Sequence, residues 1–100
     1  MDIAAFRASV EASAPIDHLS HALQALWHDA KGDWNRAHEV AQDVEDETGA
    51  WVHAYLHRKE GDESNAAYWY RRAARSVERG SLDAEWKQIV EALLSGRTRP

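Results

Sequence analysis

The stretch Gly32-Asp33-Trp34-Asn35-Arg36-Ala37 recurs 29 residues later as Gly61-Asp62-Glu63-Ser64-Asn65-Ala66. Each copy lies between two stretches in which apolar residues return every three or four positions, the spacing of an amphipathic helix. Glycine favours the end of a helix because it adopts left-handed backbone angles without strain, and an aspartate that follows it can cap the next helix. The repeat therefore predicts two hairpins, each made of a helix, a Gly-Asp turn and a second helix.

Helix breakers and capping residues divide the whole chain into about six helices, and no segment alternates apolar and polar residues long enough to form a strand. The expected parts are an N-terminal helix (1–13), a first hairpin (15–47), a second hairpin (49–79) and a C-terminal capping helix (81–96). Pro15 is expected in the first turn of the helix that opens the first hairpin. Thr48 is expected to cap the helix that opens the second hairpin. Because the links are short, neighbouring helices should be antiparallel in a single all-α domain, residues 1–100.

The composition excludes several classes of protein. The chain has no cysteine, which excludes thiolate metal sites. Its net charge of −5 argues against a general nucleic-acid binder. No apolar run approaches the roughly 20 residues of a membrane span, and the first residues do not form a signal peptide. We therefore expect a cytoplasmic protein without a membrane partner.

The charge is divided unevenly along the chain. Residues 1–50 carry three basic and ten acidic side chains, whereas residues 51–100 carry nine basic and seven acidic ones. This asymmetry fits two solvated surfaces, and it also fits attraction between two copies of the chain.

Over residues 18–79 the hairpins resemble tetratricopeptide-type repeats. The turn of that family is Gly-Asp, an aromatic residue, two variable residues and Ala; the first copy fits it, and in the second Glu63 replaces the aromatic residue. Ala25 and Ala54 stand where the first helix of such a repeat has a small residue. Residues 66–74 are similar to the second helix of a related short-repeat subfamily. The spacing of 29 residues is shorter than the family's usual value of about 34.

The resemblance implies that the concave face binds a protein or peptide. The residues that would face this groove in the second repeat are Trp51, Tyr55, Arg58 and Lys59. Aromatic rings beside basic groups would suit an acidic or carboxylate-ended peptide. The alternative is that Trp51 and Tyr55 pack under the capping helix, because a chain with only two repeats needs such a cap.

A second group of basic residues follows in the next helix. The expected stripe for an anion or a partner consists of Arg71, Arg72, Arg75 and Arg79. It could hold phosphate or RNA, and it could equally pair with the acidic segments of this chain or of a second copy.

The chain contains six histidines, and three of them form a candidate metal site. His53 and His57 are four residues apart, so both rings can point to the same side of one helix, and His28 would be the third ligand. The segment between His53 and His57 lacks the glutamate of zinc hydrolase helices. The alternative is that all three histidines are structural.

The sequence thus favours a small protein-interaction domain that is not an enzyme, with no cofactor and no catalytic residue. Its partner would be another protein or a second copy of the chain. Five Trp are more than one small core easily buries, so some of them are expected at an interface. The alternative is a protein of another class, a helical protein that binds a metal ion or a small ligand through the histidines. Such a protein could be an enzyme.

Overall fold

Six α-helices form the computed structural model, which describes residues 1–95, and no strand occurs within that range. The helices are α1 (Ile3–Ser9), α2 (His21–Ala30), α3 (Trp34–Ala41), α4 (Glu47–Lys59), α5 (Glu63–Arg72) and α6 (Leu82–Ser95). The all-α class and the number of helices are confirmed. Gly96, the expected end of the last helix, lies outside the described residues.

The two Gly-Asp turns have the same geometry. Gly32 and Gly61 have φ angles of +93° and +89°, the left-handed region that glycine adopts without strain. Asp33 and Asp62 then cap α3 and α5, each accepting a hydrogen bond from the backbone N–H three residues later. The repeat quoted above therefore forms two equivalent helix–turn–helix units.

The second helix starts later than expected. Residues 11–20 are not helical, and α2 begins at His21 with Ser20 as its cap, so Pro15 is not in the first turn of a helix. Ile16 has helical spacing to the apolar residues of α2, but its side chain is 38% exposed and finds no core to pack against. The N-terminal helix likewise ends at Ser9 instead of residue 13.

The boundary between the hairpins also differs from the expectation. The third helix ends at Ala41, and α4 begins at Glu47 with Asp46, not Thr48, as its cap. The acidic residues before α4 therefore lie near a helix N-terminus, where the helix dipole favours negative charge. Gly49 permits this tight turn, because a Cβ atom there would lie 2.0 Å from the Val44 carbonyl oxygen.

The fifth helix ends at Arg72, seven residues before the expected end at Arg79. Ala74 has a φ angle of +59°, and the N–H of Arg75 donates to the Tyr70 carbonyl, which closes the helix. Residues 73–81 form an irregular link to α6, which Ser81 caps as expected.

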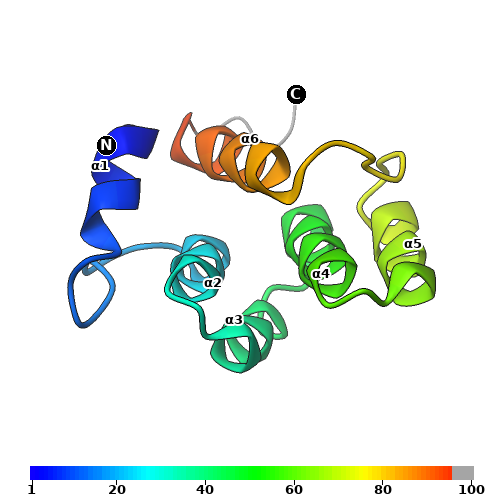
Figure 1. Ribbon diagram of the computed structural model, residues 1–100, viewed down its shortest axis with the longest axis horizontal. Helices are drawn as coiled ribbons and strands as arrows, with labels where there is room; N and C mark the ends of the chain where they lie inside the picture. The colour runs from blue at the N-terminus through cyan, green and yellow to red at the C-terminus, as the bar shows by residue number, and fades with distance from the viewer. Residues whose placement is uncertain (96–100) are drawn as a thin grey trace.

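Figure 1 shows how the helices are arranged. Helices α2 and α3 pack against each other and form the first hairpin, and α4 and α5 form the second in the same way. α6 crosses α2 and α4 on the side away from α3, and α1 packs against α6. The first helices of the two hairpins are therefore covered by α6, on the face where the family resemblance places a peptide.

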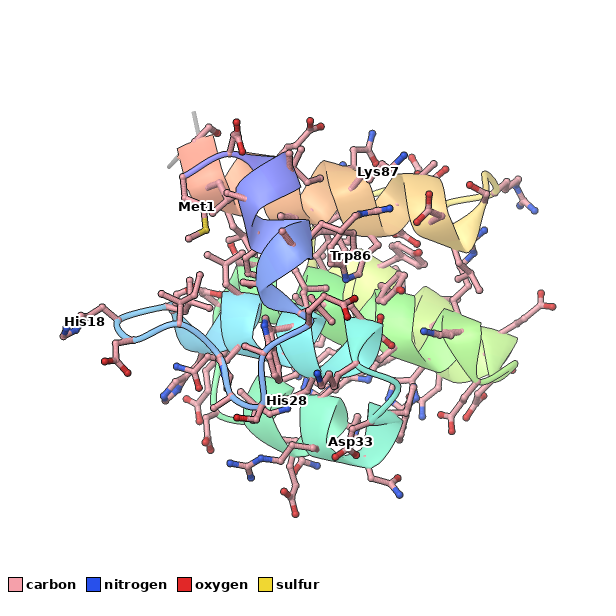
Figure 2. The ribbon with its side chains drawn as sticks, turned by 60° about the vertical axis from the view of Figure 1, so that its left-hand side comes forward. Met1, His18, His28, Asp33, Trp86 and Lys87 are labelled. Carbon is pink, nitrogen blue, oxygen red and sulfur yellow. The ribbon has the colours of Figure 1, made fainter. Side chains whose placement is uncertain are left out.

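A buried carboxylate fixes α6 to this face. Glu85 is 1% exposed and accepts hydrogen bonds from Trp51 Nε1 at 3.1 Å, Tyr70 OH at 2.5 Å and Arg58 Nη1 at 2.9 Å. The neighbouring Trp86 points into the interior in Figure 2 and donates to the Leu26 carbonyl at 3.1 Å, whereas Lys87 points away. α6 is thus held by one polar anchor and one aromatic anchor.

Replacing Glu85 by Ala should lower the free energy of unfolding by about 3–5 kcal/mol, because half-buried Arg58 loses its ion-pair partner and the buried Trp51 and Tyr70 lose their hydrogen-bond acceptor. Urea unfolding followed by circular dichroism measures this loss. The matched control is Glu91→Ala, an exposed glutamate of the same helix, which should change stability by no more than about 0.5 kcal/mol. Equal effects of the two substitutions would show that Glu85 does not anchor α6.

Candidate metal centre

Three histidines from two helices meet on the other side of α4. His38 comes from α3, and His53 and His57 come from α4. One ring nitrogen from each lies within 4.8 Å of the others. The ring centroid of His38 is 5.1 Å from those of both His53 and His57, which are 6.1 Å from each other.

Helical spacing explains why the rings converge. His53 and His57 are one turn apart on α4, and their ring planes are nearly parallel, at 16°. His38 follows Trp34 by one turn of α3, and Trp34 Nε1 donates to the Leu56 carbonyl of α4 at 2.8 Å. This hydrogen bond fixes the face of α3 that carries His38 against α4.

Two tryptophans hold the orientation of the rings. Trp34 stacks on His38 with centroids 4.9 Å apart and planes at 8°. Trp69 of α5 stacks on His53 with centroids 4.2 Å apart and planes at 14°. Because stacking restricts rotation of the imidazoles, the arrangement exists before any ligand arrives.

A carboxylate orients the third ring. His57 Nδ1 lies 2.7 Å from Glu60 Oε1, so a proton on Nδ1 completes a hydrogen bond to this carboxylate. Nε2 of the neutral ring is then unprotonated and can act as a metal ligand. Metal-binding histidines typically have this kind of carboxylate or carbonyl partner on the second nitrogen.

His53 has a nitrogen without a partner. The residue is 4% exposed, and its Nδ1 is the one buried side-chain nitrogen or oxygen in residues 1–95 that lacks a hydrogen bond. Leaving such an atom unsatisfied costs free energy, so it calls for an explanation such as a bound ion. A metal ion within the cluster would satisfy it.

His38 and His53 are in the protonation state that binds metals. Burial, together with the nearby His38 and His57, lowers the pKa of His53 to about 4. Burial and the charge of His57 also lower the pKa of His38. Both rings are therefore neutral near pH 7, and a neutral imidazole offers a lone pair to a metal ion.

A tetrahedral ion would require the cluster to contract. Zinc–nitrogen bonds of about 2.0–2.1 Å at tetrahedral angles place ligand nitrogens about 3.3–3.4 Å apart. The nitrogens of the cluster lie within 4.8 Å of one another, so the three side chains would have to move closer together around the ion. No carboxylate of the described residues joins the three imidazoles, so one coordination position remains for a solvent molecule.

His28, the expected third ligand, is not part of this cluster. It lies on α2 with its ring 5.1 Å from that of Trp27, and burial followed by the charge of Arg36 lowers its pKa. Helix packing does not bring His28 to the histidines of α4. No spacing in the sequence pointed to His38, because its place in the cluster depends on how α3 packs against α4.

The four residues expected to bind a peptide do contact carboxylates, but these belong to the same chain. Trp51 and Arg58 bind Glu85, as described above. Tyr55 OH donates to Asp29 Oδ2 at 2.7 Å, and Lys59 Nζ donates to Asp29 Oδ1 at 2.9 Å. Trp51 and Tyr55 are buried, which is the packing alternative considered from the sequence.

The four arginines do not form one helical stripe, because α5 ends at Arg72. Arg72 lies over the rings of Tyr68 and Trp69, and the guanidinium carbon of Arg75 lies 3.5 Å from the centroid of the Trp51 ring. Arg71 and Arg79 are exposed.

In comparisons with known proteins, no family model, no curated protein and no solved structure matches the chain. The resemblance to tetratricopeptide-type repeats therefore stays a prediction. Within residues 1–95, no helix is both long and apolar enough to cross a membrane.

The lowered pKa of His53 predicts a loss of stability in acid. Between about pH 6.5 and pH 4, His53 is protonated in the unfolded chain but stays neutral in the folded protein, so the free energy of unfolding should fall as the pH falls. We expect this histidine to account for a decrease of about 2–3 kcal/mol. Urea unfolding of metal-free protein at several pH values measures it. A His53→Leu variant should lose less stability over this range, and equal losses in both proteins would contradict the assignment.

Proposed function

We propose that this chain is a small cytoplasmic protein that binds one divalent transition metal ion, best matched by Zn²⁺, through His38, His53 and His57. The observation that carries the proposal is the buried His53 Nδ1, which lacks a partner in a cluster of three imidazoles. Three imidazole nitrogen ligands suit zinc, copper or nickel, whereas calcium and magnesium require oxygen ligands.

The surroundings of the cluster support a cation. Three carboxylates, those of Glu45, Asp46 and Glu47, line a cavity that His53 also lines. Acidic side chains outnumber the basic one, Arg72, in this lining, and an excess of negative charge favours cations at the opening. The carboxylate of Glu60 on His57 further favours a positive charge near that ring.

Isothermal titration of EDTA-treated protein with zinc chloride tests the proposal, and we expect saturable binding of one ion per chain. His38→Ala and His57→Ala should each abolish tight binding, and circular dichroism should show that at least the variant of half-buried His38 remains folded. Zinc at 100 times its Kd should raise the free energy of unfolding by about 2.7 kcal/mol.

The matched control is His28→Ala, which removes a histidine of α2 outside the cluster and should bind zinc as the wild type does. No saturable binding by the wild type would contradict the proposal. Unchanged binding by both cluster variants would contradict it as well.

We also propose that the outer surface of α5 binds a protein partner, a second copy of this chain. Tyr68 is 43% exposed, and Arg72 stacks over Tyr68 and Trp69. Tyrosine, tryptophan and arginine are the residues most enriched at energetically important positions of interfaces. The acidic segment 43–47 of a second copy would complement the positive charge of this surface.

Light scattering across a range of protein concentrations tests the second proposal, and we expect a dimer at high concentration. Tyr68→Ala should shift the equilibrium towards monomer. The control is Ile16→Ala, which removes an exposed apolar side chain in the loop before α2 and should have no effect. A monomer at every concentration would contradict the proposal.

A further inference from the structure

A cavity of about 350 Å³ lies where four helices meet. Residues of α1 and of the turn after it line the cavity, together with the last turns of α2 and α4 and the first turn of α6. Its volume falls within the range of roughly 300–1,000 Å³ that is usual for small-molecule sites. Among the described residues, no histidine contributes to its wall, so a ligand bound here would be independent of the proposed metal site.

Part of the wall is apolar. The side chains of Val10, Ala30 and Leu82 line the cavity together with the ring of Trp86. Trp86 is 4% exposed and points inward from α6 (Figure 2). Because the burial of apolar surface is favourable, we expect a ligand of this cavity to have an apolar part.

Two cations of the wall have hydrogen-bond donors to spare. The ammonium of Lys59 has three N–H groups, and within residues 1–95 it makes one hydrogen bond, to buried Asp29 at 2.9 Å. The guanidinium of Arg7 has five N–H groups, and in the same range it makes one hydrogen bond, to Asp83 at 3.2 Å. The remaining donors of both groups are available to an anionic group of a ligand.

One carboxylate of the wall is unpaired. Glu11 is exposed, and its side chain makes no hydrogen bond or ion pair with the described residues. The ammonium of Lys31 does not pair with it, but donates to the carbonyl oxygens of Val10 and Ala12, at 2.6 Å each. Glu11 is therefore available as an acceptor for a positively charged group of a ligand.

The wall thus carries charges of both signs. A ligand that is only anionic would meet the unpaired Glu11, and a ligand that is only cationic would meet Arg7 and Lys59. A zwitterion gives each of these groups a partner of the opposite charge. The class of small molecule that combines a carboxylate, an ammonium and an apolar part is the free α-amino acid with an apolar side chain.

We propose that this cavity binds one such amino acid, with L-leucine as the probe. Its carboxylate accepts hydrogen bonds from Arg7 and Lys59, and its ammonium donates to Glu11. The leucine side chain packs against Leu82 and Trp86. The buried hydrogen bonds of Asp29 stay as they are, because the ligand uses only the donors that this carboxylate leaves free.

Isothermal titration with L-leucine tests the proposal, and we expect saturable binding of one molecule per chain. Isocaproate, which lacks the ammonium, and isopentylamine, which lacks the carboxylate, should each bind at least about tenfold more weakly, because each loses charge-assisted hydrogen bonds. Equal affinities of the three compounds would overturn the proposal, as would the absence of saturable L-leucine binding.

Two variants assign the two charged groups of the ligand. Glu11→Gln should weaken L-leucine binding about tenfold but should not weaken isocaproate binding, because isocaproate has no ammonium. Arg7→Ala should weaken L-leucine binding but not isopentylamine binding. Both replaced residues are exposed, and circular dichroism checks that the variants are folded. L-leucine binding that neither variant weakens would overturn the assignment of this cavity.

Two controls complete the test. Glu91→Gln changes an exposed glutamate of α6 outside the cavity wall and should bind L-leucine as the wild type does. His38→Ala should also keep wild-type L-leucine binding, although it should lose tight zinc binding. L-leucine binding without zinc binding would overturn the metal site alone, and zinc binding without L-leucine binding would overturn the amino-acid site alone.

Discussion

α4 is buried on all its sides, and the rest of the structure depends on this constraint. Nine consecutive residues, Gly49–His57, are buried, between α3 and α5 on one side and α2 and α6 on the other. A helix in such a place is normally apolar all round, yet this one carries two histidines, a tyrosine and the indole N–H of a tryptophan. Each buried polar group needs a partner inside the protein, since water cannot reach it.

The two sides of α4 meet this need differently. Towards α2 and α6, carboxylates complete the hydrogen bonds: Asp29 binds Tyr55 and Lys59, and Glu85 binds Trp51 and Arg58. Towards α3 and α5, imidazoles and indoles stack on one another, and His53 Nδ1 has no partner. The first side is a closed structural core that holds α6 in place. The second brings three imidazoles together beside a cavity, the arrangement on which the proposed metal site rests.

The parts of the fold that depend on local chemistry could be predicted from the sequence. The two Gly-Asp turns and the cap at Ser81 follow from backbone angles and N-terminal capping. The ends of α3 and α5 could not be predicted, because apolar residues continue at helical spacing past Ala41 and Arg72, as far as Val44 and the exposed Val77. Within the site, the spacing of His53 and His57 predicted that they share a side of one helix. The contribution of His38 depends on how α3 packs against α4, which no spacing within one helix reveals.

X-ray absorption spectroscopy of the zinc-loaded protein shows whether the three histidines bind the ion, because it reports the ligands that surround the metal. We expect three imidazole nitrogens at about 2.0–2.1 Å and one further light atom from solvent. A shell made only of oxygen atoms, or one with fewer than three imidazoles, would show that the histidines around α4 are packing residues and not a metal centre.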